Sequence, residues 1–447
     1  MIKFGLSSYL PLVIYISSVV TYFIMLFYKR EIGLYFIVAL IPMQVLIEKI
    51  QVFPLGKDIV DIYLVTLLLL CLLRPEKQEE RDLNFLIPMK PILFYMFLTY
   101  VFLWIGSFIN GLDLPISGED VRFINWKNHM ILPVLFIVTF KIIYNKRQMI
   151  NLISVIIISM FLVSFHFYRN FGHTGGHFRE ERRWSGVFTY LGPNEIGAFW
   201  AEYSFIILGL LLISKVGPWK WPLIGVLGLN IYCMVYSFSR GAYLAFGIAF
   251  LFISVATRNI KAIVFVSLMA IILTYLIPQS AIERVNMTQD EEVGLESSAA
   301  GRLGRWKHGV DLFIKNPLGY GYETVAVLGF RGNRGYLSSK GDPHNRYVEF
   351  LVEMGIIGIA LFLYLFYLAF KGGWKLYLMA EDNFLKGLGL GFSATVVACF
   401  IVNIFGDRWT YAMLGAFYWV VWALVVRGNI IANKKQSMVE LNSTATV

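Results

Sequence analysis

Charge is scarce in this sequence. Of its 447 residues only 15% are charged, whereas 57% are hydrophobic and the mean hydropathy is +0.65. A water-soluble fold of this length would have far too little polar surface, so soluble enzymes and soluble binding modules are excluded. Series of alternating ten-residue segments, typical of an outer-membrane barrel, are missing, whereas apolar runs of roughly 17–25 residues recur. The sequence predicts an all-α, polytopic helical membrane protein.

Cysteine is also rare. Cys71, Cys233 and Cys399 each lie inside an apolar run. Buried small side chains are the expected role there, so neither disulfides nor cysteine-ligated metal is predicted. His173 and His177 lie close together, but no third or fourth metal ligand is spaced near them. We therefore predict no metal site and no cofactor.

Apolar runs predict about twelve or thirteen transmembrane helices. They lie near 8–28, 32–47, 59–73, 91–110, 128–144, 149–168, 194–214, 221–238, 242–257, 261–278, 346–370, 385–405 and 410–427. The first run has no small-residue cleavage site, so we expect a retained span rather than a signal peptide. The expected organisation is N-terminal transmembrane helices over 1–277, an external loop with amphipathic helices over 278–345, and C-terminal transmembrane helices with a cytoplasmic tail over 346–447.

The formal net charge of +10 is distributed unevenly. Most lysines fall in loops that alternation places on one side, which is therefore cytoplasmic, and membrane orientation explains them better than a nucleic-acid partner. The external loops 169–193 and 278–345 are instead rich in arginine: Arg169, Arg179, Arg182, Arg183, Arg284, Arg302, Arg305, Arg331 and Arg334. Guanidinium groups clamp phosphate with two hydrogen bonds, which predicts binding of a lipid phosphate or diphosphate. Contact with anionic headgroups of the bilayer is the alternative.

The longest polar interruption runs from 278 to 345, and loops of this length are typically functional. Within it, Leu303, Trp306 and Val310 recur at helical spacing, which predicts an amphipathic helix on the membrane surface. Arg302 and Arg305 fall on an adjoining face of this helix. They either bind an anion or form a solvated surface.

Two further stretches have residues suited to chemistry at the external surface. Ser239, Arg240 and Gly241 stand at the end of a predicted span, where Arg240 either binds a diphosphate or extends to the headgroups. His344 and Asn345 stand where the long loop meets the next span. A histidine there can take a proton from a hydroxyl, although a single histidine is also common in structural roles.

The joint order and spacing of several short motifs resembles the O-antigen ligase and O-antigen polymerase superfamily over roughly 120–370. The motifs are residues 183–188 (RWSGVF), 193–198 (PNEIGA), 239–242 (SRGA), 301–306 (GRLGRW), 316–321 (NPLGYG), His344 with Asn345, and 353–358 (EMGIIG). The resemblance implies a bacterial inner-membrane glycosyltransferase of GT-C-like helical fold. Such enzymes take a glycan from undecaprenyl diphosphate on the periplasmic face.

The same resemblance implies roles for individual residues. Arg240 and Arg302, with Arg305 beside them, would bind the diphosphate, and His344 would orient or deprotonate the acceptor hydroxyl. Metal independence and inversion at the sugar C1 atom are expected. Further candidates for substrate binding are Arg183, Asn194, Ser239, Tyr320 and Asn345.

The acceptor stays open at this stage. A ligase would use lipid A-core, a polymerase would use another lipid-linked repeat unit, and a related branch glycosylates protein hydroxyls. A transporter of lipid-linked glycans is the alternative from a different class, but it would require polar residues lining a path near mid-membrane and two pseudo-symmetric halves. We favour an O-antigen ligase-like enzyme in lipopolysaccharide or surface-polysaccharide biosynthesis.

Overall fold

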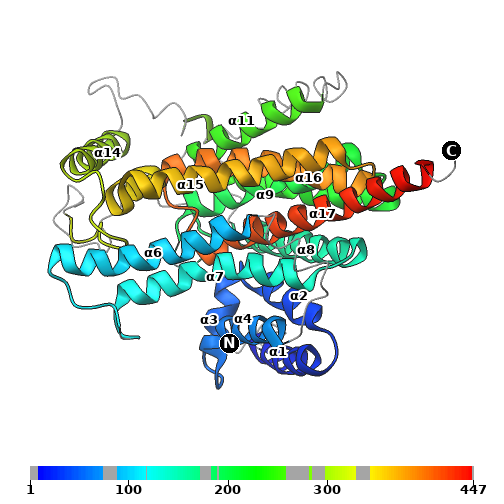
Figure 1. The fold of residues 1–447 in the computed structure, drawn as a ribbon, viewed down its shortest axis with the longest axis horizontal. Helices are drawn as coiled ribbons and strands as arrows, with labels where there is room; N and C mark the ends of the chain where they lie inside the picture. Colours follow the sequence, from blue (N-terminus) through cyan, green and yellow to red (C-terminus); the bar gives the residue numbers. More distant parts are fainter. Residues whose placement is uncertain are drawn as a thin grey trace.

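A computed structural model describes residues 9–73, 88–116, 118–171, 183–188, 191–257, 281–283, 297–328 and 343–444. Across these residues the regular structure is entirely helical, which confirms the predicted fold class (Figure 1). The α-helices are α1 (Leu10–Phe27), α2 (Arg30–Leu40), α3 (Gln44–Ile50), α4 (Ile59–Leu73), α6 (Met89–Asn110), α7 (Val121–Ile142), α8 (Lys146–Asn170), α9 (Pro193–Ile213), α10 (Lys220–Tyr236), α11 (Arg240–Thr257), α14 (Ser297–Lys315), α15 (Arg346–Met379), α16 (Asn383–Val402) and α17 (Ala412–Thr444). The 3-10 helices are η2 (Gly56–Asp58), η4 (Gly217–Trp219) and η5 (Asn403–Phe405).

Nine of the described helices are long and apolar enough to cross a membrane. They are α1, α6, α7, α8, α9, α11, α15, α16 and α17, and each coincides with a predicted span. Two other predicted spans correspond to shorter helices, α4 with 15 residues and α10 with 17. The predicted span 261–278 lies outside the described residues.

The predicted span 32–47 is bent in the structure. The chain forms α2 and α3 instead, and their axes meet at 108°. Pro42 stands between them. Proline has no backbone N–H and its ring clashes with the preceding turn, so the helix ends before it and restarts in a new direction.

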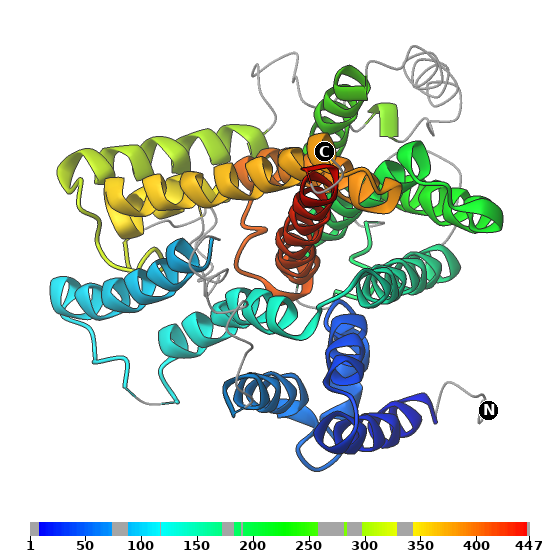
Figure 2. The ribbon, with the colours of Figure 1, turned by 45° about the vertical axis from the view of Figure 1, so that its right-hand side comes forward.

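The centre of the bundle is built from α9, α16 and α17, whereas α1 to α4 gather at one edge of the molecule in both views (Figures 1 and 2). Glycine allows α9 and α16 to approach closely. A Cβ atom on Gly209 would lie 2.5 Å from the carbonyl oxygen of Gly387 and 2.6 Å from the Cα atom of Gly391. The glycine-rich stretch of α16 therefore serves close helix packing, as its position in an apolar run predicts.

The helix α15 is broken at Gly355, whose φ of 58° and ψ of −152° are not helical. The turn that follows α14 docks on this break: Tyr320 N donates to Val352 O at 2.9 Å, and Ile356 N donates to Pro317 O at 3.0 Å. The turn thus satisfies backbone groups that the break releases. The predicted span 346–370 accordingly consists of a short segment before Gly355 and a long one after it. Trp306 and Leu312 of α14 pack against the cluster that contains Val348 and Val352 of the short segment.

Candidate anion-binding site

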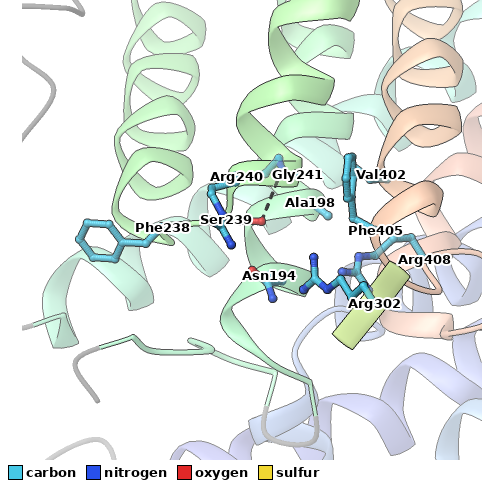
Figure 3. A pocket seen from close by; sticks show the side chains of 11 residues that line it. Asn194, Ala198, Phe238, Ser239, Arg240, Gly241, Arg302, Val402, Phe405 and Arg408 are labelled. Carbon is cyan, nitrogen blue, oxygen red and sulfur yellow. Dashed lines mark hydrogen bonds between the residues drawn. The ribbon is translucent and has the colours of Figure 1, made fainter. Parts of the chain in front are cut away.

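A narrow pocket lies where α9, α11, α14 and the end of α16 meet (Figure 3). Its charged lining consists of three arginines from three different elements: Arg240 begins α11, Arg302 belongs to α14, and Arg408 follows η5. Asn194 from the first turn of α9 and Ser239 complete its polar lining. The structure thus brings together four of the residues that the sequence analysis selected, and it adds Arg408.

The turn before α11 fixes the position of Arg240. Phe238 takes a left-handed φ of 54°, which is rare for a bulky residue and is found at sites that the surrounding structure holds firmly. The turn rests on α9, where a Cβ atom on Gly197 would lie 2.4 Å from Ser237 Oγ. Ser239 Oγ accepts a hydrogen bond of 3.4 Å from Ala242 N and so caps the first turn of α11.

Positive charge exceeds negative charge around this pocket. Burial lowers the pKa of Arg302 below its usual range, and the nearby charges of Arg408, Arg240 and Arg305 lower it further, whereas Glu195 opposes the shift. An arginine nevertheless stays protonated at neutral pH. Three other guanidinium groups and the Glu195 carboxylate thus act on Arg302 within the described residues, an arrangement suited to an anionic ligand.

Arg408 is the functional candidate that sequence reasoning missed. Its Nη1 atom lies 3.0 Å from Glu195 Oε1, and its backbone N–H donates a hydrogen bond of 3.0 Å to Asn403 Oδ1. The side chain is almost fully buried, and its Nε atom has no hydrogen-bond partner among the described residues. The signal in the sequence was the Asp-Arg pair, Asp407 and Arg408, in the loop 406–409 that the sequence predicts to be external.

Arg183 does not line the pocket, but it forms hydrogen bonds with residues that do or that lie next to it. Its Nη2 atom donates a hydrogen bond of 2.6 Å to Asn194 Oδ1, and its Nε atom donates one of 3.4 Å to Ser237 O. Because the side-chain oxygen of Asn194 accepts from Arg183, its amide nitrogen can donate to a ligand in the pocket. Arg183 therefore connects the motif at 183–188 to both α9 and the Ser-Phe-Ser turn.

His344 is not among the residues that line the arginine pocket. It is exposed at the start of α15 and has a left-handed φ of 52°. Asn345 follows it as the N-cap of α15, where Oδ1 accepts hydrogen bonds from Tyr347 N at 3.0 Å and Val348 N at 3.2 Å. His344 is thus an exposed side chain between Pro343 and Asn345, which are both buried.

Tyr320 and Arg305 also lie outside the pocket lining. The carbonyl oxygen of Tyr320 accepts a hydrogen bond of 2.8 Å from Asn110 Nδ2, and its ring packs with Val325, Val348 and Val352. These contacts give Tyr320 a packing role between α6 and α15. Arg305 is half-buried and acts on the pocket through its charge.

Within the described ranges, no three His, Cys, Asp or Glu side chains are grouped so that they could hold a metal ion. His173 and His177 lie outside those ranges. The groups that surround the pocket are therefore guanidinium, amide and hydroxyl donors, which suit an anion.

The model of the O-antigen ligase family matches residues 225–363. This stretch resembles the O-antigen ligase family. It contains α11 with Arg240, α14 with Arg302, and the beginning of α15 with His344. The motif resemblance is thus confirmed over this stretch, whereas Arg183, Asn194 and Arg408 lie outside the matched residues.

Two curated relatives from Rickettsia each resemble a little under half of this chain. A protein of Rickettsia prowazekii, provisionally named a polysaccharide ligase, is 28% identical over 223 residues, which are 45% of this chain and 51% of that protein. A protein of Rickettsia conorii with the same kind of name is 28% identical over 207 residues, 43% of this chain and 46% of that protein. The chain spans about half the length of the curated relatives that it matches.

Proposed function

We propose that this protein is a glycosyltransferase of the bacterial inner membrane, and that it transfers a glycan from undecaprenyl diphosphate to a hydroxyl group of lipid A-core at the periplasmic face. The convergence of Arg240, Arg302 and Arg408 in one pocket is the observation that carries this proposal. Three guanidinium groups in one pocket lining suit a ligand with several negative charges, such as a diphosphate.

In the proposed reaction, the acceptor hydroxyl oxygen forms a bond to C1 of the donor sugar, and the bond from C1 to the phosphate oxygen breaks. The electron pair of that bond leaves with undecaprenyl diphosphate, and the hydroxyl proton passes to a ring nitrogen of His344. Attack on the face opposite the leaving group inverts the configuration at C1. His344 acts as the general base, and its exposure gives an acceptor access to it.

The arginines of the pocket stabilise the charge that develops during the reaction. Negative charge grows on the departing diphosphate, and fixed guanidinium groups stabilise it without reorganisation during the step. The proposed enzyme therefore uses no divalent cation. Loss of transfer in EDTA and its recovery with Mg²⁺ or Mn²⁺ would contradict this part of the proposal.

Transfer by purified protein in lipid vesicles tests the whole proposal. The donor is undecaprenyl diphosphate-linked glycan, and the acceptor is either lipid A-core or excess donor. We expect transfer to lipid A-core by the wild type, and loss of transfer in Arg240→Ala and His344→Ala. Transfer to a second donor molecule alone would make the protein a polymerase. Movement of the donor across the bilayer without transfer, equal in wild type and both variants, would make it a transporter.

A further inference from the structure

Two charged residues of opposite sign connect the segments that hold Arg408 and His344. Asp407 directly precedes Arg408, and Arg346 is the second residue after His344. Arg346 Nη1 lies 2.8 Å from Glu349 Oε2 and 3.6 Å from Asp407 Oδ2. The ion pair between Arg346 and Asp407 thus joins the loop after α16 to the start of α15.

Asp407 holds its own loop in one conformation. Its Oδ1 atom accepts hydrogen bonds from Trp409 N at 2.9 Å and Thr410 N at 3.1 Å, and its Oδ2 atom accepts one from Thr410 Oγ1. Its side chain also fixes the loop relative to α15 through Arg346. Arg408 therefore belongs to a loop that is held by its own hydrogen bonds and by an ion pair with Arg346 of α15.

Arg346 is 1% exposed, and aromatic rings surround it. Its guanidinium carbon lies 4.3 Å from the ring centre of Phe350 and 5.9 Å from that of Tyr322. Cation–π contacts and a single buried position leave this side chain little freedom to reorient. The position of Arg346 therefore determines where the start of α15 lies relative to Asp407.

A second chain of hydrogen bonds connects the same two segments. Trp409 Nε1 donates to Tyr95 OH at 3.0 Å, and Tyr95 OH is 3.0 Å from His129 Nε2. The other ring nitrogen of His129, Nδ1, is 2.5 Å from Tyr322 OH, and the Tyr322 ring faces Arg346. The loop and the start of α15 are therefore connected by two routes that both end at Arg346, the first through Asp407 and the second through Tyr322.

We propose that Arg346 and Asp407 are positioning residues, which fix His344 at a set distance from the arginine pocket. This inference rests on the proposed function, since it assigns the acceptor to His344 and the diphosphate to the pocket. A buried ion pair is weak support for stability, because apolar residues of similar volume often replace such pairs without loss. Transfer between two bound substrates, in contrast, depends strongly on their separation, and a misplacement of 1 Å can lower the rate about 100-fold.

Asp407→Asn in the full-length protein tests this role, because it removes the charge and keeps an oxygen for the backbone N–H groups. Asp382→Asn is the matched control. Asp382 lies at the other end of α16, accepts hydrogen bonds from Phe384 N at 3.0 Å and Leu385 N at 3.2 Å, and pairs with Lys146. Three quantities are measured in each variant: kcat for transfer to lipid A-core, Kd for undecaprenyl diphosphate, and Tm.

We expect Asp407→Asn to lower kcat about 100-fold while Kd stays equal to that of Asp382→Asn. Tm falls below that of the control, because removal of one partner of a buried pair destabilises a protein, but Arg346 keeps Glu349 as a partner at 2.8 Å. A kcat equal to that of the control would overturn the positioning role, and so would a Kd that rises in proportion to the loss of rate. Should Asp407→Asn fail to fold, Arg346→Lys is measured instead. This variant keeps the positive charge but loses the planar guanidinium group, so a lower kcat with an unchanged Kd is again expected. A wild type that binds the donor but transfers nothing would overturn the proposed function itself, and the positioning role with it.

Discussion

Trp306 Nε1 donates a hydrogen bond of 3.0 Å to the carbonyl oxygen of Pro343. Trp306 belongs to α14, the helix from which Arg302 lines the arginine pocket, and Pro343 directly precedes His344. One side chain of α14 therefore lines the arginine pocket, and another, about one turn further along, donates a hydrogen bond to the backbone beside the proposed base. This contact gives α14 a role in both halves of the proposed reaction.

Trp306→Phe removes this hydrogen bond and keeps most of the ring packing. A neutral hydrogen bond contributes about 1 kcal/mol, so we expect kcat for transfer to fall about fivefold, with little change in Kd for the donor. Trp104→Phe on α6 is the matched control, because the indole nitrogen of Trp104 has no hydrogen-bond partner among the described residues. Equal rates in the two variants would show that the Trp306 bond does not position His344.

Arg408→Ala tests the residue that the structure adds to the site. A charge-assisted hydrogen bond contributes about 1.5–3 kcal/mol, so we expect binding of inorganic pyrophosphate to weaken about 10- to 100-fold. Arg122→Ala is the control, since Arg122 is paired with Asp120 at 2.6 Å and does not line the pocket. Isothermal titration of both variants measures the difference. Unchanged affinity in Arg408→Ala would remove this arginine from the proposed site.

The fold class and most spans could be predicted from the sequence because apolar length alone indicates a membrane helix. The bends could not be predicted with the same ease. Pro42 explains the turn between α2 and α3 once it is seen, but the break at Gly355 depends on a partner far along the chain. The turn at Pro317 to Gly321 supplies the missing backbone contacts, and only the tertiary structure reveals that pairing.

Part of the candidate site could likewise be predicted from the sequence, and part only from the structure. Arg240 and Arg302 stand in recognisable motifs, and the structure places both in one pocket. Arg408 has no such motif, and it reaches the pocket only because α16 packs against α9 and ends beside Glu195. Asn345 is a residue that the sequence motif selected but whose observed contacts are structural. Its neighbour His344 made it a candidate for substrate binding, whereas its side-chain oxygen accepts the hydrogen bonds of a helix cap.

Asp120 predicts a pH-dependent contribution to stability at the start of α7. Its side chain accepts hydrogen bonds from Arg122 N at 2.8 Å and Phe123 N at 3.3 Å. Burial alone would raise the pKa of Asp120, but the hydrogen bonds and charge of Arg122 outweigh burial and lower it. A lowered pKa means that the stabilisation is complete above the pKa of the unfolded chain, near 4, and is lost as the pH falls through the folded value.

Asp120→Ala should therefore cost about 1 kcal/mol of stability at pH 7, the usual contribution of an N-cap. The difference in Tm from wild type should shrink as the pH is lowered from 5 towards 2. Asp113→Ala, which removes an exposed carboxylate of the same loop, should leave Tm unchanged at every pH. A Tm difference for Asp120→Ala that stays constant down to pH 2 would contradict this account of the cap.

Gly197→Ala tests whether the Ser-Phe-Ser turn must rest directly on α9. The added Cβ atom would lie 2.4 Å from Ser237 Oγ and 2.8 Å from Ser239 Cβ, so the turn has to move away from α9. Arg240 follows this turn, and we expect donor affinity to fall about tenfold or more because a guanidinium clamp tolerates little displacement. Gly247→Ala in α11 is the matched control, since nothing described lies within 4 Å of its added Cβ atom. Alanine favours a helix over glycine by up to about 1 kcal/mol, so the control should be folded and active, and equal donor affinity in both variants would refute the close approach.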